Sequence, residues 1–196
     1  LADGYFVLPY TIQNYLADQI TVPRFSTELP EFAEAEKAVQ ARIDHLMGIK
    51  GKKSVDSIHK ELGHIMWEYV GMGRTEEGLK TALKLLKDIR KEFETNLFIP
   101  GSTEGVNIEL EKALRLNDFI TMGELIAYDA LNRNESCGGH FREEYQTEEG
   151  EAKRDDENYF YVSCWEYQGS DDVAPVLYKE PLVYEAIKVQ TRNYKS

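Results

Sequence analysis

The feature that most constrains the fold is an amphipathic stretch that runs from Asn107 to residue 131. Its face consists of Leu110, Ala113, Leu114, Asn117, Ile120, Leu125 and Ala130. Most of these residues lie three or four positions apart, which is the spacing that places side chains on one side of an α-helix. Asn107 is a suitable N-cap. Because a helix with one apolar face has to bury it, the stretch predicts the central helix of a packed domain.

Four earlier stretches show the same spacing and predict helices that can pack on the central one. They are residues 1–20, 30–47, 54–69 and 75–93. Ser54 and Thr75 are suitable N-caps, and Pro30 is tolerated at a first helical position. The apolar faces of the last three consist of Phe32, Ala35, Val39, Ile43 and Leu46, then Ile58, Leu62, Ile65, Met66 and Tyr69, then Leu79, Leu83, Leu86, Ile89 and Phe93.

The first of these stretches is unusually aromatic for a terminal helix. Pro9 predicts a kink or a helix start within it. We interpret its rings, Tyr5, Phe6, Tyr10 and Tyr15, as packing on the bundle, and the alternative is that they face a domain missing from the chain. The chain also begins without Met and inside an apolar stripe. These features indicate an excised piece of something longer.

The spacing of apolar residues changes from a helical to an alternating pattern beyond residue 158. Residues 159–164 alternate, and residues 173–189 are rich in Val, Tyr and Leu with Pro175 and Pro181 between them, so we expect two or three short antiparallel strands. Residues 143–151 are acidic and predict a solvated loop. The predicted fold class is mostly α: an antiparallel, three-helix-bundle-like domain with a short antiparallel β tail. We divide the chain into residues 1–28, 29–134 and 135–196.

Charge and cysteine content limit the possible partners. The formal net charge is −12, which argues against nucleic acid because phosphate neutralisation needs a basic face. Proteins are the more plausible partners. Cys137 and Cys164 lack CxxC spacing, so the sequence suggests neither a disulfide framework nor a thiolate metal site. We find no signal peptide and no apolar run that could span a bilayer.

Familiar catalytic motifs are absent from the sequence. His59 and His64 are five residues apart, whereas a zinc-binding His pair on a helix needs a step of four. The Gly71-Met72-Gly73 run joins two predicted helices, so we interpret it as a helix–helix turn rather than a nucleotide loop. The sequence contains no Gly-x-Ser-x-Gly elbow and no Walker loop.

Polar chemistry instead concentrates after the central helix. Residues 132–142 read Asn-Arg-Asn-Glu-Ser-Cys-Gly-Gly-His-Phe-Arg, and residues 153–159 read Lys-Arg-Asp-Asp-Glu-Asn-Tyr. His140 is the best single candidate for chemistry, although a histidine hydrogen-bonded within a turn is the favoured interpretation. Asp155 and Asp156 are best interpreted as capping or salt-bridging groups.

These two motifs resemble the C-terminal region of the flavoprotein subunit of succinate dehydrogenase and fumarate reductase. That family typically carries Glu-Ser-Arg-Gly-Ala-His and then Arg-Asp-Asp followed by an aromatic residue. The opening Leu-Ala-Asp-Gly-Tyr-Phe-Val-Leu-Pro-Tyr also looks like the family's helix after its Asn-Arg-Leu-Gly segment. Cys137 replaces the usual Arg and Gly139 the usual Ala, which resembles the menaquinone-linked variant with a dihaem membrane anchor.

The resemblance implies a non-catalytic piece of a larger enzyme. The parent would interconvert succinate and fumarate on FAD and pass electrons to an iron-sulfur subunit, at the cytoplasmic face of a bacterial inner membrane through an anchor subunit. Residues 1–28 would then lie at the edge of the missing flavin domain. The resemblance implies no catalytic, FAD-binding or metal-binding residue in this fragment, which would pack on the flavin domain and the iron-sulfur subunit.

Charged groups beside glycines suit directional hydrogen bonds. We therefore expect interdomain or intersubunit contacts at Arg133, Glu135, His140, Arg142 and Arg154. The alternatives are the C-terminal domain of a related flavoprotein, L-aspartate oxidase or adenylylsulfate reductase, and an independent helical protein-interaction module.

Overall fold

The computed structural model describes residues 1–170 and 173–190 of the chain. The chain divides into two compact units, residues 1–44 and residues 45–196, and each is described by itself. The predicted boundaries at residues 28 and 134 stay a prediction.

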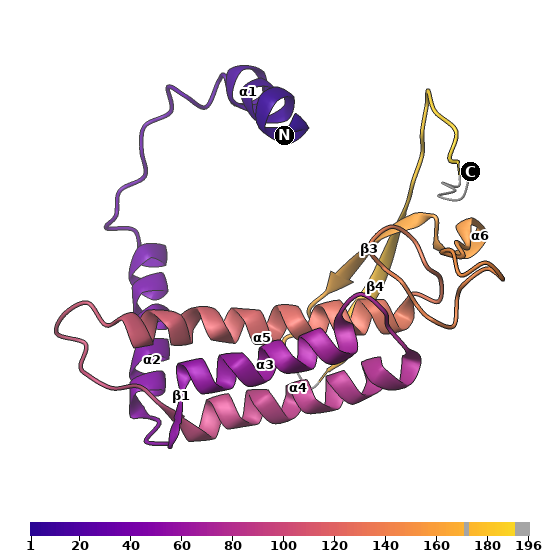
Figure 1. Ribbon diagram of the computed structural model, residues 1–196. Helices are drawn as coiled ribbons and strands as arrows, with labels where there is room; N and C mark the ends of the chain where they lie inside the picture. Colours follow the sequence, from indigo (N-terminus) through magenta and orange to yellow (C-terminus); the bar gives the residue numbers. More distant parts are fainter. Residues whose placement is uncertain (171–172, 191–196) are drawn as a thin grey trace. The chain divides into compact units, whose positions relative to one another are not determined.

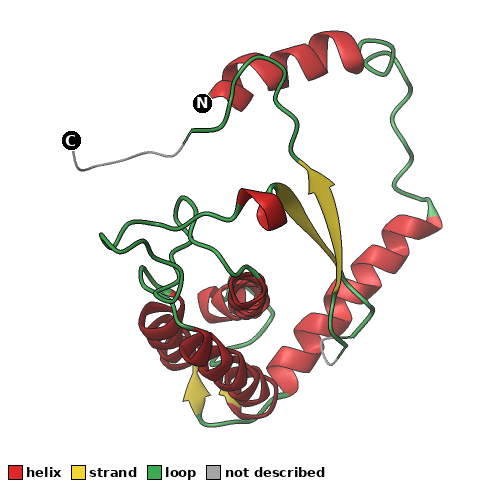
Figure 2. Cartoon of the chain, turned by 90° about the vertical axis from the view of Figure 1, so that its right-hand side faces the viewer, coloured by secondary structure: helices red, strands yellow, loops and turns green. Residues whose placement is uncertain are grey.

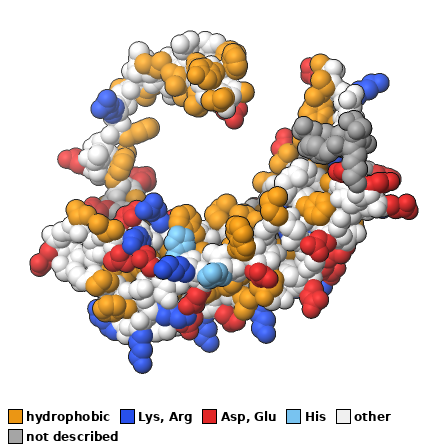
Figure 3. All heavy atoms as spheres, in the orientation of Figure 1, with side chains coloured by type: hydrophobic (Ala, Val, Ile, Leu, Met, Phe, Trp, Pro, Cys, Tyr) orange, Lys and Arg blue, Asp and Glu red, His pale blue; other side chains and the backbone are white. Residues whose placement is uncertain are grey.

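The first unit has no core of its own, since none of residues 1–44 is buried. It opens with the helical segments η1 (Asp3–Val7), α1 (Leu8–Tyr10) and η2 (Thr11–Tyr15), of which η1 and η2 have wide π turns. Hydrophobic side chains cover this helical segment in the space-filling view (Figure 3), and Phe6 is 75% exposed. α2 (Pro30–Gly48) begins in the same unit.

The predicted helix over residues 1–20 is too long. Helical geometry ends at Tyr15, because the backbone of Leu16 (φ −99°, ψ 8°) leaves the helical region, and turns follow. Pro9 lies in the first turn of α1, as expected for a residue that lacks an N–H. The apolar stripe predicted for α2 is also not a buried face, since Leu46 is its one buried residue.

The second unit is a three-helix bundle of α3 (Val55–Val70), α4 (Glu76–Asn96) and α5 (Ile108–Asn132) (Figure 1). β1 (Lys53–Ser54) just before α3 pairs with β2 (Leu97–Phe98) just after α4, so α3 and α4 run antiparallel. Lys112 at the start of α5 contacts Asp56 at the start of α3, so α3 and α5 run parallel. Figure 2 views these helices nearly end-on. The predicted fold class is confirmed.

Local capping explains where the three helices begin. The side chains of Ser54, Thr75 and Asn107 each accept a hydrogen bond from the backbone N–H of the residue three positions on. All three were predicted as N-caps, and each satisfies an N–H group that a helix start leaves without a partner. Gly71 to Gly73 lies in the turn between α3 and α4, as predicted.

The core lies between these helices. Its apolar members include Val55, Ile58, Leu62, Val70, Leu79, Ala82, Leu86, Ile89, Phe93, Leu110, Ala113, Leu116, Ile120, Ala127 and Ala130. On α4, Ala82 is buried where we expected Leu83. On α5, the expected Leu125 is 37% exposed, and the buried face instead contains Leu116, Gly123 and Ala127. From Gly123 onward the buried face consists of small residues, Gly123, Ala127 and Ala130, whose short side chains allow α5 to approach its neighbours closely.

The β tail begins with the four-residue helix α6 (Asp156–Tyr159) and continues with β3 (Tyr161–Glu166) and β4 (Val176–Pro181). The two strands are antiparallel, with Cys164 opposite Tyr178, as the alternating pattern predicted. Tyr161, Ser163 and Trp165 alternate with more exposed residues. Trp165 packs edge-on against Tyr128 and donates from Nε1 to Oδ1 of Asp129 over 2.7 Å, which fixes β3 against α5.

Candidate functional site

Four of the five predicted contact residues, all except Arg154, lie where α5 ends and the chain turns back. Arg133 is the C-cap of α5, and Glu135 follows it at 3% exposure. His140 closes a tight turn, in which the backbone groups of Cys137 and His140 hydrogen-bond to each other and Gly138 has a φ of +59°. A left-handed backbone of this kind favours glycine, which explains the first of the two glycines.

Arg133 joins the end of α5 to the β tail. Its Nε donates to Oε1 of Glu135 over 2.9 Å, and its Nη2 donates to the backbone carbonyls of Tyr159 and Tyr161. The guanidinium also lies over both tyrosine rings, 5.7 and 5.3 Å from their centres. Oε2 of Glu135 accepts from the backbone N–H of Asp155 over 2.9 Å. This buried carboxylate is therefore paired on both oxygens.

His140 is held in one neutral tautomer. Nη1 of Arg74 lies 2.9 Å from Nδ1, and because arginine only donates, Nδ1 must accept. Nε2 therefore carries the proton and donates to the carbonyl of Arg133 over 2.9 Å. Burial is the main reason that the pKa of His140 lies below its usual value, and the nearby cations Arg74, Arg142 and Arg133 lower it further against that hydrogen bond. The structure thus supports the interpretation of His140 as hydrogen-bonded within a turn.

Arg142 is fully buried and ties the loop to two helices. Its Nη1 donates to the carbonyls of Ala130 and Leu131 in the last turn of α5, where the helix dipole favours a positive charge. Its Nε donates to Oε2 of Glu144 over 3.1 Å, and Oε1 of Glu144 accepts from the N–H of Glu76 at the start of α4. Burial raises the pKa of Glu144, but these hydrogen bonds and Arg142 outweigh it and lower the pKa overall.

Arg154 lies apart from this network. It forms an ion pair with Asp156, and its Nη1 donates to the carbonyl of Gln190 over 3.2 Å. The hydrogen bonds that Arg154 donates to Asp156 are the main cause of its raised pKa. Asp155 caps α6 by accepting from the N–H of Asn158. Both aspartates therefore serve in capping or salt bridging, as predicted.

Three residues that take part in these hydrogen bonds were not predicted from the sequence. Arg74 pairs with His140 and also donates from Nε to the carbonyls of Val70 and Gly71. The hydroxyl of Ser136 exchanges hydrogen bonds with the backbone of Arg142, and Glu144 lies in the segment that we expected to be a solvated loop. Of the three, only Arg74 could have been found from the sequence. It directly follows the Gly71-Met72-Gly73 turn at the end of α3, and a cation at such a position can hydrogen-bond the last carbonyls of a helix.

The arrangement is suited to fixing structure rather than to catalysis. We call Arg74, Arg133, Glu135, His140, Arg142 and Glu144 the arginine cluster. Each of its ionisable groups is held by the hydrogen bonds described above, so none is positioned as a base beside a nucleophile. Within residues 1–170 and 173–190, no group of three or more His, Cys, Asp or Glu residues could hold a metal ion. A hollow of about 540 Å³ beside the cluster is lined by Arg74, Arg133, Cys137, His140 and the apolar Leu125 and Ile126, among others.

Comparison with protein families places the chain. The family described as "Fumarate reductase flavoprotein C-term" matches residues 59–194. The chain belongs to this family. The match begins within α3 and includes α4, α5 and the arginine cluster. The resemblance inferred from the Asn132–Arg142 and Lys153–Tyr159 motifs is therefore confirmed.

Individual relatives are similar over part of their length. An uncharacterized FAD-dependent oxidoreductase of Methanocaldococcus jannaschii is 31% identical over 112 residues, which are 57% of this chain and 20% of the relative. The fumarate reductase flavoprotein subunit of Proteus vulgaris is 29% identical over 148 residues, 74% of this chain and 24% of the relative. A chloroplastic L-aspartate oxidase of Nicotiana tabacum is 37% identical over 88 residues, which are 45% of this chain and 13% of the relative. The chain thus spans at most about a quarter of these relatives.

Solved structures share the fold. The Sdh1 complex of Mycobacterium smegmatis with UQ1 has a TM-score of 0.68 at 22% identity, covering 87% of this chain and 26% of that one. Adenylylsulfate reductase of Archaeoglobus fulgidus has a TM-score of 0.61 at 20% identity, covering 90% and 28%. Among the described residues, no helix is long and apolar enough to cross a membrane.

Proposed function

We propose that this chain is the C-terminal helical domain of a flavoprotein subunit that interconverts succinate and fumarate. The observation that carries the proposal is the family match over residues 59–194, together with the fumarate reductase subunit among the relatives. The activity would belong to the whole subunit, of which this domain is a structural part.

FAD would supply the redox chemistry of that subunit, by taking up or giving a hydride equivalent. A dinucleotide site of the usual kind needs a glycine-rich turn between a strand and a helix. In the described part of the chain, β1 leads directly into α3 without such a turn. The segment between β2 and α5 does contain Gly101 and Gly105, but they do not have the Gly-x-Gly-x-x-Gly spacing. We therefore infer that FAD is held by residues outside this chain. The role of this domain is to present a rigid surface to the part that holds it.

The arginine cluster supports that role. It fastens the segment after α5 to the turn between α3 and α4, so that two distant parts of the chain form one end of the bundle. Glu135 and Arg142 are buried and engaged within the domain, so their contribution to an interface would be indirect, through the shape of that end. Arg133, His140 and Arg154 remain partly accessible and are the predicted direct contacts.

The proposed partners follow from the same family assignment. They are the flavin-binding part of the parent protein, an iron-sulfur subunit and, through it, a membrane anchor, with the assembly at the cytoplasmic face of a bacterial inner membrane. The exposed rings of residues 1–15 would be covered by the flavin-binding part, because large apolar patches mark interaction surfaces. The Cys137 and Gly139 replacements favour the menaquinone-linked variant with a dihaem anchor, which stays a prediction.

A substrate assay on the native protein tests the proposal. The polypeptide that carries this sequence is purified from its own cells and supplied with fumarate and a reduced viologen dye. We expect dye oxidation that depends on fumarate. L-aspartate oxidase is a second candidate, favoured by the similarity to the Nicotiana tabacum enzyme. Oxidation of L-aspartate, or dye oxidation with adenylylsulfate, in place of fumarate reduction would overturn the proposal in favour of one of these relatives.

A further inference from the structure

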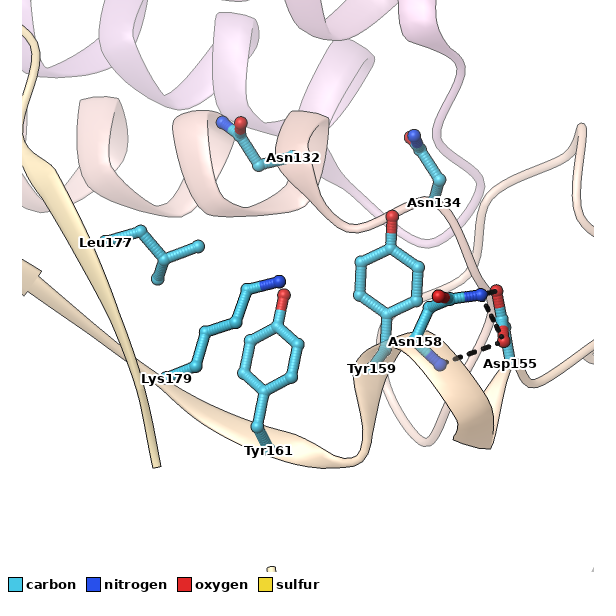
Figure 4. Close-up of a pocket in the computed structure, with 8 residues that line it drawn as sticks. All are labelled: Asn132, Asn134, Asp155, Asn158, Tyr159, Tyr161, Leu177 and Lys179. Atoms are coloured by element: carbon cyan, nitrogen blue, oxygen red, sulfur yellow. Dashed lines mark hydrogen bonds between the residues drawn. The ribbon is translucent and has the colours of Figure 1, made fainter. Parts of the chain in front are cut away.

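Beside the β tail lies a hollow of about 400 Å³ with a polar lining. It is lined by Asn132, Asn134, Asp155, Asn158, Tyr159, Tyr161, Leu177 and Lys179 (Figure 4). The lining comes from the end of α5, from α6 and from both strands of the tail. Segments that are far apart in the sequence therefore meet at this hollow.

Several hydrogen-bond donors in the hollow are unused. Among the described residues, no hydrogen bond or ion pair is made by the side chain of Asn134, the hydroxyls of Tyr159 and Tyr161, or the ammonium of Lys179. Figure 4 shows the Tyr159 hydroxyl directed toward Asn134, and the Lys179 ammonium and the Tyr161 hydroxyl directed to the same side. The ammonium also lies over the Tyr161 ring, 4.5 Å from its centre, so the cation and this ring are neighbours in the hollow.

The carboxylate of the hollow, in contrast, is already engaged. Oδ1 of Asp155 accepts from the backbone N–H of Asn158 and, like Oδ2, from its Nδ2. The hollow thus uses its acid internally and leaves one cation and several neutral donors available. Such a set complements a ligand that brings acceptor oxygens and a negative charge.

The two tyrosines among these donors are held in place before any ligand arrives, whereas Asn134 and Lys179 are exposed. Arg133 binds the backbone carbonyls of Tyr159 and Tyr161 and lies over both rings on the side of the arginine cluster. Because these tyrosines are fixed, a ligand would not have to order them, which favours binding. Leu177 adds an apolar contact that an inorganic anion cannot use.

We propose that this hollow binds a carboxylate carried on a short aliphatic chain, with Lys179 as the charge partner and Tyr161, Tyr159 and Asn134 as hydrogen-bond donors. The carboxylate can belong to a free small acid or to a glutamate side chain of a polypeptide. The inference rests on these contacts and does not depend on the proposed enzyme activity.

The test is a titration of the full 196-residue chain followed by NMR, with glutarate as the free acid and the blocked tripeptide acetyl-Ala-Glu-Ala-amide as the polypeptide form. We expect saturable shifts of the Asn134 side-chain amide signals with at least one probe, and the tighter probe identifies the source. Lys179→Gln should weaken binding about tenfold or more, and Tyr161→Phe about threefold to tenfold while keeping the ring for Arg133.

Matched controls keep the test specific. Lys87→Gln on α4 removes an exposed lysine outside the hollow, and Tyr178→Phe removes a neighbouring hydroxyl that instead bonds Glu166. Both should bind like the unchanged chain, and neutral glutaramide should not bind. The proposal is overturned if glutarate and the peptide give no saturable shift, if Lys179→Gln binds as well as Lys87→Gln, or if inorganic phosphate binds as tightly as the better carboxylate.

Discussion

Arg142 shows how a full positive charge is kept inside this domain. Its guanidinium donates hydrogen bonds to two carbonyls in the last turn of α5 and pairs with Glu144. The negative end of the helix dipole therefore compensates part of the buried positive charge. His140, in contrast, stays neutral, because burial lowers its pKa and Arg74 donates a hydrogen bond to its acceptor nitrogen. The arginine cluster is therefore held together by hydrogen bonds that require charged arginines and a neutral histidine.

Replacing Arg142 should damage the domain more than replacing an exposed arginine. Arg142→Ala leaves two helix carbonyls without a partner and opens a cavity, so we expect a loss of about 2–4 kcal/mol in the free energy of unfolding, measured with urea. Arg115→Ala is the matched control, because Arg115 is 62% exposed and, among the described residues, pairs only with Glu111 on the same helix. It should cost less than about 1 kcal/mol. Equal losses would show that Arg142 does not fasten the loop.

The protonation state of His140 makes stability depend on pH. Because its folded-state pKa lies below the ordinary value of about 6.5, the unfolded chain takes up a proton first as the pH falls. Stability contributed by neutral His140 is complete above about pH 6.5 and is lost as the pH falls from there toward the folded-state pKa. We expect less than about 1.4 kcal/mol per pH unit, since solvent screens a partly exposed ring.

His140→Gln provides the comparison for that effect. Glutamine does not titrate, so the difference in unfolding free energy between the two chains should shrink as the pH falls from about 7.5 to about 5.5. Urea unfolding at both values measures it. A difference that stays constant across this interval would contradict the neutral, hydrogen-bonded histidine.

Among the helices, the first residues could be predicted from the sequence, whereas the buried faces could be predicted only in part. Ser54, Thr75 and Asn107 act within three residues of their own position, so the sequence alone identifies them. Which side of α5 is buried depends on how closely the other helices approach it. The spacing of hydrophobic residues in the sequence does not contain this information. The pair of two-residue strands β1 and β2 joins segments more than forty residues apart and left no pattern of its own.

The same reason limited the prediction of the site. The motif around His140 pointed to the end of α5, because glycines and charged residues stand together in sequence. Arg74 is 66 residues from its partner His140, and nothing local marks the pair. Glu144 was assigned to a solvated loop on composition, whereas one hydrogen bond from the start of α4 places it in the cluster.

Gly123 tests the packing of α5 directly. A Cβ atom at this position would lie 3.1 Å from Sδ of Met66 and 3.6 Å from side-chain atoms of Leu62 and Leu86. Gly123→Val should therefore overpack the contact and cost about 1–3 kcal/mol in thermal or urea unfolding. Gly63→Val is the matched control, since Gly63 lies in α3 with nothing near its missing Cβ. It should change stability by less than about 0.5 kcal/mol. Equal costs for the two substitutions would show that α5 does not pack closely at Gly123.

At the scale of the whole molecule, the two units differ in what holds them together. The buried apolar core begins at Leu46, and residues 1–44 contribute nothing to it. The second unit thus has the packed interior that an independent fold requires, whereas the first exposes an aromatic helix. The family match over residues 59–194 lies entirely within the second unit.

A chain that begins at residue 45 should therefore fold cooperatively. We expect its midpoint of thermal unfolding, followed by circular dichroism, to lie within about 4 °C of the value for the full chain, a shift that corresponds to less than about 1 kcal/mol. Leu86→Ala in the same truncated chain should lower the midpoint clearly, because it removes a fully buried side chain. A truncated chain without a cooperative transition would show that residues 1–44 are part of the fold.

We propose that this bundle is the C-terminal domain of a flavoprotein acting on succinate and fumarate, and this proposal can be tested directly. The most direct measurement is the visible absorption spectrum of the polypeptide that carries this sequence, purified natively from its own cells. We predict a flavin band that is bleached by succinate and restored by fumarate. A native protein without flavin, or with a flavin that neither acid affects, would contradict the claim.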